Sequence, residues 1–194
     1  MDALTFPRQG EIPCRPLRKE PFPAMRFHFD RFEFRNAKLS EWEELTALEK
    51  VCFPPNEACT SEQLRQRIEK ASENFFVACD QVNPKLAGFL CGICSDEPRF
   101  RDEFFMDAAL HEPAGKTVYL LGLNVSPEYR HHGLATALMD RYIEREKARG
   151  REALVLTCHT HLVTFYEGFG FEDLGIGDSR WGGESWHDMR LSLR

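Results

Sequence analysis

The chain has 194 residues, 42% of them hydrophobic and 29% charged, which favours one soluble globular domain and excludes a mostly disordered or fibrous protein. The formal net charge of −6 makes nucleic acid a poor expected partner, because nucleic-acid-binding proteins present a basic face, and it suits a cationic small molecule better. No apolar run reaches the ~18 residues of a membrane span and no secretion signal is visible, so we expect no membrane contact and a cytoplasmic location.

The N-terminal segment is rich in proline. Residues 1–25 carry five of the eleven prolines, a density that blocks both helix and sheet. We therefore predict an extended arm over 1–25 and a single folded domain over 26–194. The arm also contains Asp2, Glu11 and Glu20, which argues against a mitochondrial transit peptide.

The folded region alternates between strand-like and helix-like apolar patterns. In chain order, the predicted elements are a strand at 27–34, helices at 42–51 and 60–71, strands at 75–79 and 86–94, a short helix near Phe104, a strand at 118–125, a helix at 133–149, a strand at 153–158, a short helix at 162–168, and strands at 171–174 and 186–193. Capping boxes at Ser40–Glu43 and Thr60–Gln63 mark two helix starts, and Gly150 marks a helix end. This order predicts an α/β architecture with a partly parallel sheet.

The seven cysteines are scattered through the chain. Because no secretion signal is visible, we expect reduced thiols. Cys91 and Cys94 have the spacing of a redox or zinc pair, but they lie in a predicted strand and no second pair completes a metal site. We expect packed free thiols at both positions and no metal site.

The most informative segment joins the 118–125 strand to the 133–149 helix. It contains the pattern Arg130-x-x-Gly133-x-Ala135. A helix start offers unpaired backbone N–H groups and a partial positive charge, and small side chains let a diphosphate approach the main chain. The segment lacks the lysine and second glycine of a Walker loop and the three glycines of a dinucleotide fingerprint. By itself the pattern also fits an ordinary tight strand-to-helix turn.

A second motif lies downstream, where Phe165 and Tyr166 are followed by Gly170 and Phe171. The two motifs and the order of elements over 26–194 together resemble the GNAT superfamily of N-acetyltransferases. The resemblance implies an α/β fold with a mixed, mostly antiparallel central sheet that is splayed between two central parallel strands and flanked by helices. It also implies transfer of acetyl from acetyl-CoA to a primary amine by direct attack.

A narrower resemblance rests on residues 52–61, 156–159 and 162–166. These segments are similar to the arylalkylamine (serotonin-type) N-acetyltransferases, above all to microbial and fungal members, some of which act on polyamines. The implied substrate is a small arylalkylamine or a polyamine. Where the animal enzymes carry two histidines on the strand before the turn, this chain has Tyr119 and Leu121, so the proton route of that branch is not carried over.

The resemblance implies where acetyl-CoA binds. The residues assigned to it are Leu123, Asn124, Val125, Arg130, His131, His132, Gly133, Leu134, Ala135, Thr136, His159 and Tyr166. The diphosphate is expected on the turn amides, and the pantetheine arm along the open edge of the 118–125 strand. A strand bulge near Gly122 is expected to expose an N–H group that stabilises the oxyanion.

The resemblance also implies catalytic roles. Tyr166 matches the family tyrosine that protonates the departing thiolate, a step that a phenol can perform without a steep barrier. Candidates for the base that deprotonates the substrate ammonium are His159, His161 and Tyr119. A lone histidine is also often a hydrogen-bonded structural residue, and this alternative stays open for His159.

The 53–61 loop is expected to bind the amine. Phe53 can stack on an aromatic or alkyl group, Pro54 stiffens the loop, and Glu57 can attract the cation, although Glu57 equally fits a solvated surface carboxylate. Two other functions stay open: acetylation of protein lysines or N-termini, and a non-catalytic acetyl-CoA-binding module. The sequence is compatible with a monomer or a homodimer.

Overall fold

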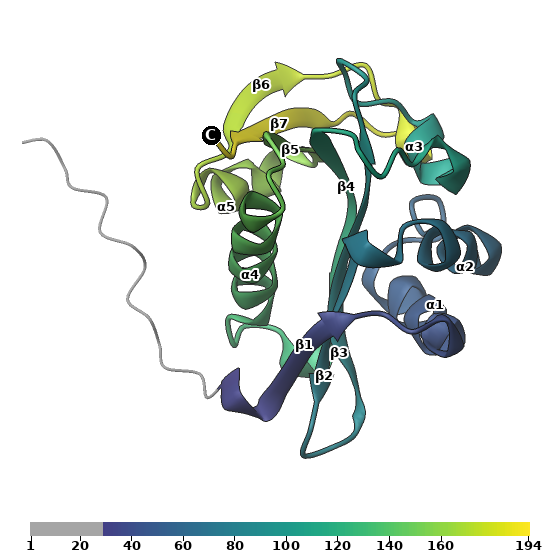
Figure 1. Cartoon of the computed structure of the whole chain (residues 1–194). Coiled ribbons are helices and arrows are strands. Elements are labelled where there is room, and N and C mark those ends of the chain that lie inside the picture. The colour runs from purple at the N-terminus through teal and green to yellow at the C-terminus, as the bar shows by residue number, and fades with distance from the viewer. Residues whose placement is uncertain (1–28) are drawn as a thin grey trace, which may run out of the picture.

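A computed structural model describes residues 29–194 (Figure 1). The arm predicted for 1–25 and the start of the 27–34 strand lie outside the described residues. The strands are β1 (Phe32–Asn36), β2 (Phe75–Asp80), β3 (Lys85–Ser95), β4 (Thr117–Val125), β5 (Ala153–Cys158), β6 (Glu172–Ile176) and β7 (His187–Ser192). The helices are α1 (Trp42–Cys52), α2 (Ser61–Lys70), α3 (Glu103–Met106), α4 (Leu134–Ala148) and α5 (Val163–Glu167).

The seven strands form one mixed sheet in the order β1-β2-β3-β4-β5-β7-β6. Neighbouring strands are antiparallel except for β4 and β5, which confirms the mixed, mostly antiparallel sheet that the family resemblance implied. Thr117–Tyr119 of β4 pairs with Ala153–Val155 of β5, and the pairing stops there although both strands continue. The C-terminal halves of the two parallel strands are therefore splayed apart.

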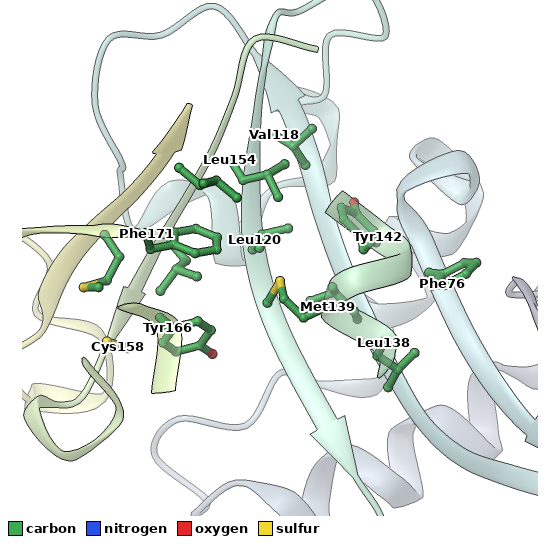
Figure 2. Packing of buried hydrophobic residues seen from close by; sticks show 14 of the residues in the cluster. Phe76, Val118, Leu120, Leu138, Met139, Tyr142, Leu154, Cys158, Tyr166 and Phe171 are labelled. Carbon is green, nitrogen blue, oxygen red and sulfur yellow. The ribbon is translucent and has the colours of Figure 1, made fainter. Parts of the chain in front are cut away.

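Helices cover both faces of the sheet: α1, α2 and α3 lie on one face, and α4 and α5 on the other (Figure 1). Successive side chains of β4 point to opposite faces of the sheet and so contribute to both hydrophobic cores. Val118 and Leu120 lie in the core under α4, and Tyr119 and Leu121 lie in the core under α1 and α2. Figure 2 shows the first of these cores. Burial of each large apolar side chain contributes ~1.5–3 kcal/mol, so β4 is anchored from both sides. None of the helices in residues 29–194 is long and apolar enough to cross a membrane.

Two predicted element starts differ from the structure. A 3-10 turn at Phe29–Arg31 takes up part of the predicted first strand, and β1 runs on to Asn36 instead. The Ser40–Glu43 capping box is wrong, because a 3-10 turn at Leu39–Glu41 precedes α1 and the Glu41 carboxylate accepts the Lys38 N–H at 2.7 Å.

The other local predictions are confirmed. Gln63 N–H donates to Thr60 Oγ1 at 3.2 Å, and Thr60 N–H donates to Gln63 Oε1 at 2.8 Å, so the second capping box starts α2. Gly150 has a φ of +75° just after α4, in the conformation expected at a helix end. Cys91 and Cys94 are free and buried, and burial raises the pKa of Cys91 to about 12 and that of Cys94 to about 11, so both thiols stay protonated.

Candidate active site

The splay between β4 and β5 opens a cleft in the middle of the sheet. Its walls include Leu120–Leu123 of β4 and Leu156–His159 at the end of β5. Met139 of α4 and Tyr166 of α5 close one side, and Glu49 of α1 lies at the other. Of the second predicted motif, Tyr166 lies at this cleft, together with the end of β4 that leads into the Arg130–Ala135 turn.

A bulge interrupts β4 at the cleft. Cys91 of β3 pairs with Gly122, but the next residue, Gly92, pairs with Leu120, so Leu121 is the extra residue on β4. A bulge takes the backbone groups of its extra residue out of the regular ladder. This is the distortion expected beside Gly122. It leaves the peptide group of Leu121 outside the hydrogen-bond ladder, on a strand that lines the cleft.

The backbone of the turn after β4 has the geometry that suits an anion. His131 has a φ of +61° and Gly133 a φ of +80°, so the chain reverses sharply before α4 begins. The Ala137 N–H donates to the Gly133 carbonyl at 2.9 Å as the first bond of the helix. The N–H groups of residues 134–136 therefore precede the helical ladder and lie at the positive end of the α4 dipole.

Arg130 lies beside this turn. Its Nε donates to the Val125 carbonyl at 3.0 Å, which ties the exposed guanidinium to the end of β4. Cys52 Sγ contacts the same carbonyl at 3.4 Å, and burial raises the pKa of that thiol, an effect that the nearby Arg130 partly offsets. The fixed cation and the helix dipole add to each other, so the turn favours a negatively charged group.

Tyr166 is buried at the cleft. Its ring makes edge contacts with Phe165 and Phe171, with ring centroids 5.1 and 5.8 Å away, and Figure 2 shows its hydroxyl turned away from Phe171. Burial raises the pKa of Tyr166, and the charge that Cys158 would carry as a thiolate raises it further. The phenol therefore keeps its proton and can act as a proton donor.

Glu57 and His159 are brought together from opposite ends of the chain. The Glu57 carboxylate is 3.2 Å from His159 Nε2, and only 8% of the Glu57 side chain is exposed. Glu57 is thus a buried partner of His159 and not a solvated surface carboxylate. The His159 ring also stacks on Trp186, with centroids 4.2 Å apart.

An aromatic wall, which we define as Phe53, Phe105, Trp181 and Trp186, borders the same cleft. Trp181 Nε1 donates to the Glu57 carbonyl at 2.8 Å, and Trp186 Nε1 donates to the Trp181 carbonyl at 2.9 Å. Phe105 stacks on Trp181 with centroids 4.6 Å apart. These bonds fix the two indoles at the border of the cleft, where one face of Trp181 stacks on Phe105 and one face of Trp186 stacks on His159.

Comparison with known protein families agrees with this geometry. The sequence profile of the acetyltransferase (GNAT) family matches residues 42–171. The chain belongs to the GNAT acetyltransferase family. Among curated relatives, it is 33% identical over 112 residues to serotonin N-acetyltransferase of Mesocricetus auratus and 32% identical over 127 residues to an uncharacterised N-acetyltransferase of Bacillus subtilis. These matches cover 57% and 60% of this chain and 52% and 55% of the relatives, so the chain matches about half the length of each.

Solved structures share the GNAT fold. The loading GNATL domain of CurA from Lyngbya majuscula has a TM-score of 0.72 at 18% identity, covering 84% of this chain and 98% of that one. A phosphinothricin acetyltransferase from Sinorhizobium meliloti, solved in complex with acetyl-CoA, has a TM-score of 0.61 at 17% identity, covering 84% of this chain and 89% of that one. At these identities the likeness concerns the fold alone.

Not every predicted residue reaches the cleft of this GNAT domain. Tyr119 is 1% exposed, packs on Phe104 at 4.7 Å between centroids, and donates its hydroxyl hydrogen to the Glu97 carbonyl. It is not among the cleft-lining residues, so its hydroxyl is committed elsewhere. Pro54 is exposed and shapes the loop, because its carbonyl accepts the N–H groups of Glu57 and Ala58 at 3.0 and 2.9 Å.

Sequence reasoning missed part of the GNAT cleft. Phe105, Trp181 and Trp186 lie far along the chain from the 53–61 loop with which they share the cleft, and Glu49 looks like one of several carboxylates on α1. The one local signal was the Trp181-Gly-Gly-x-x-Trp186 segment, since large aromatics beside glycines in a polar stretch are typical of a binding surface.

Proposed function

We propose that this GNAT acetyltransferase moves the acetyl group of acetyl-CoA to the primary amine of a small arylalkylamine or polyamine. The observation that carries the proposal is that one cleft joins two different surfaces. Leu123, near the end of β4, and Met139 of α4 line it on the side of the anion-binding turn. The aromatic wall and the Glu57–His159 pair border it on the other side.

The donor side suits acetyl-CoA. The N–H groups of 134–136, the α4 dipole and Arg130 favour a diphosphate. Beyond Tyr119, β4 pairs with no strand of residues 29–194 on its β5 side, so its main-chain groups can pair with the amide groups of a pantetheine arm as an added strand would. Solved GNAT structures with acetyl-CoA bound support the choice of this donor.

The acceptor side suits a small cationic amine. The rings of Phe53, Trp181 and Trp186 border the cleft, where they can pack on an aromatic ring or an alkylammonium group, and Glu57 contributes negative charge next to them. The similarity to serotonin N-acetyltransferase supports an arylalkylamine. A protein substrate would need an open groove, whereas here Asn56 Nδ2 donates to the Gly182 carbonyl at 2.8 Å and ties the loop to the wall.

The proposed chemistry is direct attack of the neutral amine on the thioester carbonyl. At the Leu121 bulge, a backbone N–H group outside the hydrogen-bond ladder would stabilise the oxyanion of the tetrahedral intermediate. As the carbon–sulfur bond breaks, Tyr166 gives its proton to the thiolate and regains one from the nitrogen. The products are the N-acetylated amine and the free thiol.

An acceptor panel tests the proposal. Thiol release from acetyl-CoA would be followed with tryptamine, phenethylamine, spermidine, a lysine peptide and a peptide with a free N-terminus. We expect turnover with one of the small amines and none with the peptides. Turnover restricted to peptides would favour acetylation of proteins, and binding of acetyl-CoA without thiol release on any amine would favour a non-catalytic module. Absence of acetyl-CoA binding would refute the donor assignment.

A further inference from the structure

Glu49, on the last turn of α1, is a buried carboxylate with one unused oxygen. The residue is 3% exposed and lines the cleft. Its Oε1 accepts the Cys59 N–H at 3.1 Å, while Oε2 is buried and has no hydrogen-bond partner among residues 29–194. Buried polar atoms are almost always paired, so an unpaired carboxylate oxygen at a cleft calls for a ligand that supplies hydrogen atoms.

Asn124 of β4 is a second unsatisfied group, which lies next to the cleft but is not among the residues that line it. It is 0% exposed, and within the described chain neither Nδ2 nor Oδ1 has a hydrogen-bond partner. A methyl group added at Gly122, which lines the cleft, would lie 3.3 Å from Asn124 Nδ2, so the amide borders the bulge. Asn124 also approaches Glu49 and lowers the pKa of that carboxyl by a side-chain hydrogen-bonding interaction, although the two groups do not reach full hydrogen-bond geometry.

We propose that Glu49, with Asn124 behind it, forms the ammonium-binding floor of the acceptor pocket, and that Glu49 Oε2 takes one proton from the bound primary ammonium. This inference rests on the proposed function. An unpaired carboxylate oxygen and a negative charge at an apolar cleft match a primary ammonium, which carries three hydrogen-bond donors and one positive charge.

The other candidates for the proton acceptor are less suited to a cationic amine. The Tyr119 hydroxyl donates to the Glu97 carbonyl, and His161 is exposed and does not line the cleft. His159 lines the cleft and keeps one ring nitrogen beside the one that contacts Glu57, but it carries no negative charge. Glu49 combines a place at the cleft with a buried negative charge and an oxygen that has no full hydrogen bond among residues 29–194.

The surroundings of Glu49 set its basicity. Burial raises the pKa of Glu49, whereas the Cys59 N–H and the Arg67 guanidinium of α2 lower it. The thiols of Cys59 and Cys91 also face this region, and burial raises the pKa of both, so they stay neutral. A carboxylate with a raised pKa is a stronger base than one in water and accepts a proton more readily.

The protons balance in the proposed sequence. The ammonium loses one proton to Glu49, and the nitrogen lone pair then forms the bond to the carbonyl carbon. A second proton from the nitrogen replaces the one that Tyr166 gives to the thiolate, and the third stays on the amide. The Glu49 carboxylic acid returns its proton to solvent when the products leave, so one proton is released for each acetyl group transferred.

Glu49→Gln tests the proposal, because the Gln oxygen can still accept the Cys59 N–H while the charge is lost. The matched control is Glu43→Gln, which makes the same exchange at an exposed position of the same helix. With phenethylamine near pH 7, we expect kcat/KM to fall by about 100-fold in Glu49→Gln and to be unchanged in Glu43→Gln. With β,β-difluorophenethylamine, whose fluorines lower the basicity of the nitrogen so that a large fraction is neutral near pH 7, we expect a loss of less than about 5-fold.

Equal losses with the two amines would overturn the proton-acceptor role, since a merely structural residue would affect both alike. Should Glu49→Gln fail to fold, Glu49→Asp is the second variant, because it keeps a carboxylate but withdraws it from the cleft. An intermediate loss restricted to the basic amine is then expected, and a loss shared by both amines would again count against the proposal.

A binding measurement separates this inference from the proposed function. Calorimetry with phenethylammonium alone needs no turnover, and we expect its Kd to weaken by about 10-fold or more in Glu49→Gln relative to wild type and Glu43→Gln. If no amine is acetylated but this difference is found, the ammonium floor stands and the transferase proposal fails. If wild type and Glu49→Gln bind the ammonium equally, the floor itself is refuted.

Discussion

Replacing Tyr166 with phenylalanine separates the chemistry of its hydroxyl from the packing of its ring. The edge contacts to Phe165 and Phe171, at 5.1 and 5.8 Å between centroids, involve the ring and are available to phenylalanine as well. A swap that conserves shape usually costs less than about 1.5 kcal/mol in the free energy of unfolding. We therefore expect a folded variant whose only functional change is the loss of one proton donor.

The expected kinetic effect follows from the role of a general acid. Burial raises the pKa of Tyr166, so the phenol is fully protonated near pH 7 and the whole population can donate. General acids contribute about 10²–10⁴-fold to rates. We expect kcat to fall by about 100-fold, which corresponds to about 2.7 kcal/mol of transition-state stabilisation, while the Kd for acetyl-CoA changes by less than about 2-fold.

The assay combines steady-state thiol release with calorimetric titration of acetyl-CoA. Tyr142→Phe is a matched control, because Tyr142 is a buried tyrosine of the same core whose hydroxyl donates to the Asn74 carbonyl at 3.2 Å away from the cleft. That control should lose stability, since a buried carbonyl is left unpaired, and keep its kcat. If Tyr166→Phe turns over as fast as wild type, Tyr166 has no part in the mechanism.

The pH dependence offers an independent check on Tyr166. A tyrosine whose pKa is raised on folding contributes stability that is present below the unfolded value of about 10 and is lost as pH rises through the higher folded value. We expect neither kcat nor stability to decline through ionisation of Tyr166 below about pH 10. An alkaline loss of kcat with a midpoint below about pH 9 that disappears in Tyr166→Phe would contradict the buried, protonated phenol.

Three further variants probe the turn, the wall and the fold. Gly133→Glu should weaken acetyl-CoA binding by about 100-fold in calorimetry, because it puts a carboxylate where we propose that the diphosphate binds. Gly150→Glu carries similar left-handed strain and should bind acetyl-CoA normally. Trp181→Ala should raise the KM for the amine by about 10-fold and leave the Kd for acetyl-CoA unchanged. A weaker Kd for acetyl-CoA with an unchanged KM for the amine would refute the assignment of the aromatic wall to the amine. Arg31 lowers the pKa of Asp80, so this ion pair stabilises the fold above the ordinary carboxyl pKa of about 4 and the stabilisation is lost at lower pH. Asp80→Asn should therefore lower Tm near pH 7. A Tm difference from wild type that stays the same in acid would argue against this ion pair.

Local sequence signals determined most of the elements and the donor side of the cleft. Periodicity and turn chemistry act between neighbouring residues, so β5 at 153–158, the Thr60–Gln63 capping box and the helix end at Gly150 could be predicted without a structure. The Arg130-to-Ala135 pattern marked the turn for the same reason. The first helix start was missed because Glu41 bonds back to Lys38 and forms an earlier turn, which competes with the cap expected at Ser40.

Only the tertiary structure decided the acceptor side. Glu57 meets His159 across 102 positions of the chain, and Trp181 meets Glu57 across 124, so no local pattern relates them. Glu49 resembles the exposed Glu43 in sequence and becomes a buried cleft carboxylate only because α1 packs against the β4 bulge and the loop before α2. The ionisation and hydrogen bonding of such groups depend on what surrounds them in space, and that is set when distant segments pack together.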